Sequence, residues 1–157
     1  MRSFAARRKL TAQQRVFSTD PRSYRSGLEE KVAEQFRRAG IKFRFEEVTL
    51  PFVEPAKNRR YTPDFVLPNG IIIETKGLFT TEDRQKMVLI KKTYPALDIR
   101  LVFSNANARI AKASKTTYSM WAEKNGYPWA HKEVPSEWLT EPPELHRVRA
   151  LKAAVGG

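Results

Sequence analysis

The chain has 157 residues, of which 41% are hydrophobic and 29% are charged, and it carries a net charge of +12 with no cysteine. This composition predicts one globular domain in a reducing cytoplasm, excludes disulfides and thiolate metal sites, and leaves no apolar stretch of the roughly 20 residues that span a bilayer. The pI of about 10.2 indicates a polyanionic partner, most simply nucleic acid.

The first 24 residues show no hydrophobic periodicity and are rich in arginine, so we expect a basic flexible arm that orders on a phosphate backbone. Arg7, Arg8 and Lys9 are its candidate DNA contacts. A helix is predicted from Ser26, with its apolar residues recurring every four positions until a glycine stops it.

The next segment, residues 41–55, is predicted to be extended. Its apolar residues alternate in one phase at Phe43 and Phe45 and in the other phase at Val48 and Leu50. Such a switch indicates a bulge or a strand that changes neighbours, and two prolines keep the segment from being a long central strand. We interpret it as a connector.

A β-hairpin follows, and its loop length decides which side chains share a face. A two-residue Asn-Gly loop would pair Phe65 with Glu74. A three-residue loop would start at Pro68, end at Gly70 and put Asp64 directly opposite Glu74. We predict the three-residue loop, because proline suits the first central position of a type I turn and glycine suits a left-handed backbone.

The remaining pattern predicts helices near residues 81–92 and 117–125 and a buried strand at 98–104, parallel to one hairpin strand. Residues 135–139 should pack on the core, and the tail from 141 to 157 is predicted to be basic and loose. The fold class is therefore α/β, a mixed β-sheet flanked by helices.

Asp64, Glu74 and Lys76 converge in this hairpin. Two adjacent carboxylates are costly unless a cation or a proton neutralises them, and oxygen ligands favour Mg²⁺, with Mn²⁺ as a substitute. The Thr75 carbonyl could add a ligand, and Lys76 could stabilise charge on a reacting phosphate or orient a water. The alternative interpretation is a surface cross-strand pair offset by Lys76, which the apolar flanking residues disfavour.

Glu29 has two interpretations. With Ser26 it fits a capping box, in which its carboxylate only bonds the helix N-terminus. Alternatively it is a further ligand for the metal, for a second metal ion or for a water. The sequence leaves both open.

These residues resemble a known family. Pro63-Asp64, nine residues, then Glu74-Thr75-Lys76 is similar to the PD-(D/E)XK nuclease motif. The blocks RSGLEEKV, YTPDFVLPNG, ETKGL, LDIRLVFS and PSEWL resemble bacteriophage endonuclease I, the phage Holliday-junction resolvase family. The resemblance implies a restriction-endonuclease-like core and a metal-dependent endonuclease that cuts four-way and other branched DNA, leaving 5′-phosphates. It implies Glu29, Asp64, Glu74 and Lys76 as the catalytic set and, for a phage protein, the host cytoplasm.

The resemblance also implies a domain-swapped homodimer, in which the helix glutamate of one subunit meets the hairpin of the other. On this interpretation residues 25–140 form the nuclease domain and residues 45–57 form the extended bridge between swapped halves.

Basic residues near the hairpin and further along the chain are the remaining candidate DNA contacts. They are Arg59, Arg60, Arg84, Lys86, Arg109, Lys112 and Lys115. Two alternatives to a junction resolvase stay open: a nuclease of the same fold with another target, such as a restriction or repair enzyme, and a non-catalytic basic DNA-binding protein.

Overall fold

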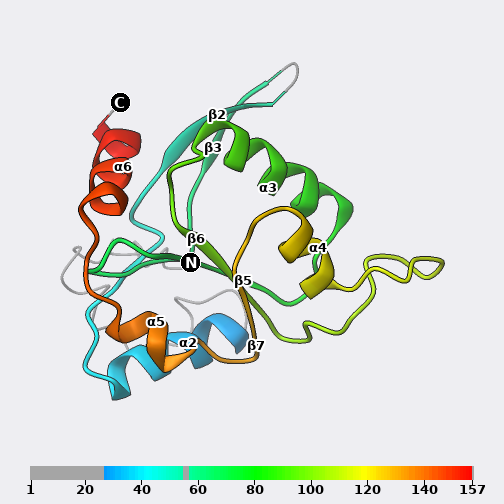
Figure 1. The fold of residues 1–157 in the computed structure, drawn as a ribbon, viewed down its shortest axis with the longest axis horizontal. Coiled ribbons are helices and arrows are strands. Elements are labelled where there is room, and N and C mark those ends of the chain that lie inside the picture. The colour runs from blue at the N-terminus through cyan, green and yellow to red at the C-terminus, as the bar shows by residue number, and fades with distance from the viewer. Residues whose placement is uncertain (1–26, 55–56, 157) are drawn as a thin grey trace, which may run out of the picture.

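The computed structural model describes residues 27–54 and 57–156. Within them, a five-stranded mixed sheet has the strand order β1-β4-β5-β6-β7, and β2 and β3 form a second, two-stranded sheet (Figure 1). The strands are β1 (Arg44–Phe45), β2 (Leu50–Glu54), β3 (Lys57–Tyr61), β4 (Phe65–Val66), β5 (Ile72–Lys76), β6 (Ile99–Phe103) and β7 (Trp129–His131). The helices are α2 (Gly27–Arg38), α3 (Thr81–Thr93), α4 (Tyr118–Lys124), α5 (Ser136–Thr140) and α6 (Leu145–Gly156). None of these described helices is long and apolar enough to cross a membrane.

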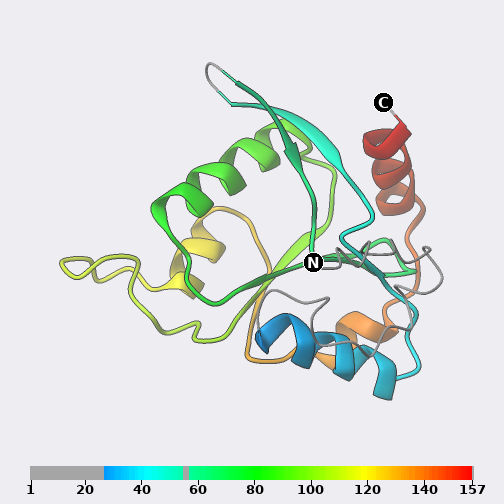
Figure 2. The same cartoon turned by 180° about the vertical axis from the view of Figure 1, so that it is seen from behind.

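Helices cover both faces of the five-stranded sheet, as predicted. Helices α2 and α5 lie on one face, and α3 and α4 lie on the other (Figures 1 and 2). Alternate residues of β5 enter the two cores: Ile73 packs in the cluster with Phe36 of α2, and Ile72 packs in the cluster with Met87 of α3. The predicted α/β class is confirmed.

The β4–β5 hairpin has the predicted three-residue loop. Phe65 pairs with Ile73 and Val66 with Ile72, and the Gly70 N–H donates to the Leu67 carbonyl at 3.0 Å. Gly70 has φ +88°, a left-handed conformation that glycine adopts without steric cost. The two-residue alternative is excluded, and continuing the observed register puts Asp64 opposite Glu74.

The connector changes neighbours, as its phase switch predicted. Strand β1 pairs with β4 in the main sheet, and β2 then leaves that sheet to pair with β3. Between them Glu46 has φ +51°, an uncommon conformation for a residue with a side chain. The sequence analysis missed the β2–β3 pairing, because the prolines obscured the strand pattern. The proposed bridge, residues 45–57, therefore contains all of β2.

The predicted parallel strand is β6, which pairs with β5 along its whole length. Strand β7, which the sequence analysis missed, extends this parallel sheet beside β6. The carboxyl ends of β5, β6 and β7 consequently lie at one edge, where the Ser104 N–H donates to the Lys76 carbonyl at 3.0 Å. The next helix, α3, starts near this edge with Thr80 as its N-cap.

The C-terminal tail differs from the prediction that it is loose. Residues Leu145–Gly156 form α6, which places Leu151 and Ala154 in the core. The apolar residues of the tail are too scattered to show a helical periodicity, so the sequence did not predict this helix. The helix is anchored by a buried arginine. Arg147 is only 4% exposed.

Arg147 ties α6 to the hairpin loop and to the start of β6. Its guanidinium donates to the Asn69 carbonyl at 3.3 Å and forms ion pairs with Asp98 and Glu141, both at 3.0 Å. Arg100 bonds the same two carboxylates. The network therefore holds the loop that sets the hairpin register against the end of the chain.

Replacing Arg147 with Met should lower the free energy of unfolding by about 3 kcal/mol, because it breaks the ion pairs of a buried guanidinium with the part-buried Asp98 and Glu141. Arg149→Met is the matched control, since Arg149 is exposed on the same helix, and it should change stability by less than about 0.5 kcal/mol. Urea unfolding measures both. Equal effects of the two substitutions would contradict this account of the tail.

Candidate active site

The candidate site lies where β4 begins and β5 ends. Asp64 immediately precedes β4, while Glu74 and Lys76 occupy β5 two residues apart and therefore share a face. Both acidic residues lie in the protein interior: Asp64 is 7% exposed and Glu74 is 4% exposed. The structure thus brings together the residues that the hairpin register predicted.

Asp64 is fixed by the residue that separates Glu74 from Lys76. Its Oδ2 accepts hydrogen bonds from the Thr75 N–H at 2.8 Å and from the Thr75 hydroxyl at 2.7 Å. The Thr75 side chain thereby orients one carboxylate oxygen of Asp64. The predicted role of the Thr75 carbonyl as a metal ligand stays a prediction.

The electrostatic surroundings of Asp64 disfavour its charge. Burial and repulsion from Glu74 raise the pKa of Asp64 to about 8, against the lowering effect of the two Thr75 hydrogen bonds; Glu29 adds a smaller upward effect. A carboxyl group in this state requires either a proton or a nearby cation near neutral pH. Asp64 can therefore accept either a proton or a positive ion.

Glu74 is held at both carboxylate oxygens. The Tyr61 hydroxyl donates to Oε2 at 2.7 Å, and the Lys76 ammonium lies 3.3 Å from Oε1. Tyr61 is fully buried at the end of β3. Burial, with the charge of Glu74 as the next cause, raises the pKa of Tyr61 well above its ordinary value, so the phenol is protonated and donates.

Lys76 is a half-buried cation rather than a neutral amine. Burial alone would lower its pKa, but the charges of Glu74 and Asp83 outweigh that effect and raise it. Asp83 lies 3.4 Å from the ammonium. It also closes the capping box of α3 by accepting from the Thr80 N–H. The Thr80-x-x-Asp83 spacing is typical of a helix cap. The additional contact of Asp83 with Lys76 could not be predicted from the sequence.

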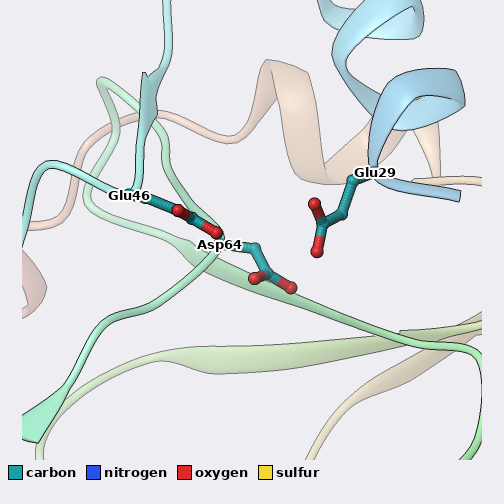
Figure 3. A group of neighbouring side chains, drawn as sticks. All are labelled: Glu29, Glu46 and Asp64. Carbon is teal, nitrogen blue, oxygen red and sulfur yellow. The ribbon is translucent and has the colours of Figure 1, made fainter. Parts of the chain in front are cut away.

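Three carboxylates among the described residues lie close enough together to hold a metal ion. Glu29, Glu46 and Asp64 each offer an oxygen, and these oxygens lie within 4.8 Å of one another. Figure 3 shows Glu29, from the first turn of α2, and Glu46, from the end of β1, approaching Asp64 from opposite sides. Oxygen ligands of this kind fit a hard divalent cation such as Mg²⁺ or Mn²⁺.

Glu46 was missed by the sequence analysis. No motif marks it, because its position depends on the left-handed backbone that ends β1. The Glu46 N–H donates to the Asp64 carbonyl at 3.2 Å, which holds the two residues side by side. For Glu29, the structure supports proximity to Asp64; its capping partner Ser26 lies outside the described residues.

The predicted DNA contacts near the site are in different situations. Arg59 pairs with Glu54 at 2.5 Å, and Arg60 is exposed on β3. Arg84 donates to the Phe79 carbonyl at 2.6 Å, so it supports the start of α3. The Lys86 ammonium lies 5.2 Å from the centre of the Tyr61 ring. Arg7, Arg8 and Lys9 lie outside the described residues.

Arg109, Lys112 and Lys115 share the long loop between β6 and α4, and all three are exposed. The loop projects from the body of the molecule (Figure 1) and is braced by the Ile110 N–H, which donates to the Thr116 carbonyl at 2.9 Å. Between Asp98 and Glu123 the sequence contains no acidic residue. The loop is therefore a uniformly positive projection, and it starts from the sheet edge that also carries Lys76.

Comparison with known proteins agrees with this geometry. Residues 10–156 match the family model of phage endonuclease I. The chain is 51% identical over 120 residues to endonuclease I of Escherichia phage T7, covering 76% of this chain and 80% of that protein. It is 49% identical over 124 residues to endodeoxyribonuclease 1 of Enterobacteria phage T3, covering 79% and 82%.

The raised pKa of Asp64 predicts a stability that depends on pH. In metal-free protein the folded state keeps this proton up to about pH 8, while the unfolded chain releases it near 3.8. The folded state binds more protons in this window, so the contribution of Asp64 to the free energy of unfolding falls as pH rises through it.

Asp64→Asn should remove this dependence. In EDTA, the variant should gain on the order of 2–4 kcal/mol relative to the original protein between pH 5 and pH 8. Urea unfolding at both pH values measures the difference. An unchanged difference between the two proteins across this range would show that Asp64 is not held in a costly charged environment.

Proposed function

Because the chain belongs to the phage endonuclease I family, we propose that it is a Mg²⁺-dependent endonuclease that hydrolyses DNA phosphodiesters and leaves 5′-phosphates. The observation that carries this proposal is the buried carboxylate Asp64, whose surroundings call for a cation, beside Glu74 and the charged Lys76. These buried acidic side chains stand out in a protein of net charge +12. A metal ion bound by them would face a polyanion that the rest of the protein attracts.

In this mechanism Asp64 and Glu74 would hold the metal, and the Thr75 carbonyl would add a ligand. Glu29 and Glu46 would complete the acidic side and could hold the same ion or a second one. When bound, Mg²⁺, or Mn²⁺ in its place, polarises the phosphoryl oxygen and lowers the pKa of a coordinated water.

Lys76 contributes positive charge at the reacting phosphate. Because nearby carboxylates keep its ammonium protonated, it is suited to stabilise the charge that develops in the transition state rather than to accept a proton from water. Its contact with Asp83 at 3.4 Å limits the directions in which the ammonium can point.

The proposed substrate is four-way (Holliday) and other branched DNA, recognised by shape through its phosphates rather than through base edges. The exposed loop with Arg109, Lys112 and Lys115 is suited to follow one arm of such a junction, since it starts at the edge of the sheet near the site. Arg60 of β3 and the basic N-terminal arm are further candidates, with Arg59, Arg84 and Lys86 secondary because they already contact the protein.

We further propose a homodimer that places two such sites on opposed strands. In a domain swap, the contacts that β2 makes with β3 in one chain would form between two chains, and Glu29 of one would reach Asp64 of the other. The β2–β3 hairpin, which extends away from the main sheet in Figure 1, is the segment suited to this exchange.

Glu74→Gln should abolish Mg²⁺-dependent cutting, because the neutral amide is a poor ligand for a hard cation, and should leave junction binding in EDTA intact. Glu82→Gln is the matched control, since Glu82 is an exposed acid of α3, and it should cut normally. Gel assays of cleavage and binding measure both. Full cutting by Glu74→Gln would refute the catalytic assignment and favour a non-catalytic DNA-binding protein.

The same assay distinguishes the substrate. At equal concentrations, an immobile four-way junction should be cut in preference to the linear duplex of one of its arms. Preference for one base sequence in linear DNA would instead support a same-fold restriction or repair nuclease.

A further inference from the structure

We propose that Tyr61 is a positioning residue of the metal site, whose hydroxyl fixes the Glu74 carboxylate in the orientation that binds the ion. This inference rests on the proposed function, because it assumes that Glu74 is a ligand. Tyr61 lies outside the acidic and lysine motif that identifies the family, and it reaches Glu74 from a different sheet.

The hydrogen bond from Tyr61 is the shorter of the two contacts that hold Glu74. It measures 2.7 Å to Oε2, whereas Lys76 lies 3.3 Å from Oε1 and also contacts Asp83. A flexible, shared lysine restricts the carboxylate less than a buried phenol does. Tyr61 therefore decides which Glu74 oxygen is presented to an incoming cation.

The phenol is itself fully enclosed by the protein. Tyr61 is 0% exposed and ends the β2–β3 ladder, where it pairs with the equally buried Leu50. The Lys86 ammonium covers its ring at 5.2 Å. The position of Glu74 is consequently set by the packing of β3 against the α3 face of the main sheet.

The arrangement parallels that of Asp64, where Thr75 bonds one carboxylate oxygen. Each of the two central carboxylates thus has one oxygen held by a neutral donor. Hydrogen bonds of this kind orient metal ligands, and removing one typically weakens metal binding about 10–100-fold.

Tyr61→Phe tests the proposal, because phenylalanine keeps the ring in the core and removes only the hydroxyl. Tyr127→Phe is the matched control: Tyr127 is 2% exposed in the same core, but its hydroxyl donates to the Met87 carbonyl. Mn²⁺ binding to the DNA-free protein, measured by isothermal titration calorimetry, is the main readout, with melting temperature measured alongside it.

We expect Tyr61→Phe to bind Mn²⁺ about 10–100-fold more weakly and Tyr127→Phe to bind it within about threefold of the original protein. The melting temperatures of both variants should fall by a similar amount. Mn²⁺ affinity of Tyr61→Phe within about threefold of the original, with a lowered melting temperature, would show a core-packing role only and overturn the inference.

A second measurement does not depend on a variant that folds. With ¹³Cζ-labelled tyrosine, Mg²⁺ addition should shift the Tyr61 resonance more than that of Tyr118, whose hydroxyl instead accepts from the Phe79 N–H. Equal shifts would overturn the inference while leaving the nuclease intact. Failure of the original protein to bind Mn²⁺ and to cut DNA would overturn the proposed function together with it.

Discussion

The register of the β4–β5 hairpin is the constraint on which the site depends. The turn through Pro68, Asn69 and Gly70 fixes the pairing of Val66 with Ile72, and that pairing carries Asp64 to the side of Glu74. A shift of one residue would turn Glu74 toward the opposite face of the sheet. The chemistry of the site is in this sense a consequence of one glycine with a left-handed backbone and one proline before it.

Two sets of contacts outside the motif maintain this arrangement. Arg147 of α6 holds the loop through the Asn69 carbonyl, and Tyr61 of β3 holds the Glu74 carboxylate. Both residues are buried. Arg147 lies in the tail that was predicted to be loose, and Tyr61 lies in the β2–β3 pair that the sequence analysis missed. The cost of gathering Asp64, Glu74 and Glu29 in one place is offset in part by the hydrogen bonds and by Lys76, and a proton or a cation would balance the charge that remains.

Much of the fold and of the site could be predicted from local signals. The turn residues gave the hairpin register, apolar periodicity gave α2, α3, α4 and β6, and the phase switch at Phe45 and Val48 gave the change of sheet. What was missed depends on contacts distant in sequence. Strand β7 is short, α6 is anchored by a charged residue, and Glu46 reaches Asp64 only because its backbone adopts a positive φ. Tyr61 carries no signal in the sequence, because its contact with Glu74 joins two different sheets.

The most direct test of this account is a crystal structure with Mn²⁺, whose anomalous scattering locates the ion without ambiguity. The account predicts an anomalous peak bonded to Asp64 and Glu74, with Glu29 or Glu46 within reach of the ion or its water ligands. A peak bound elsewhere, or Asp64 and Glu74 carboxylates turned to different faces of the sheet in the presence of the metal, would contradict it.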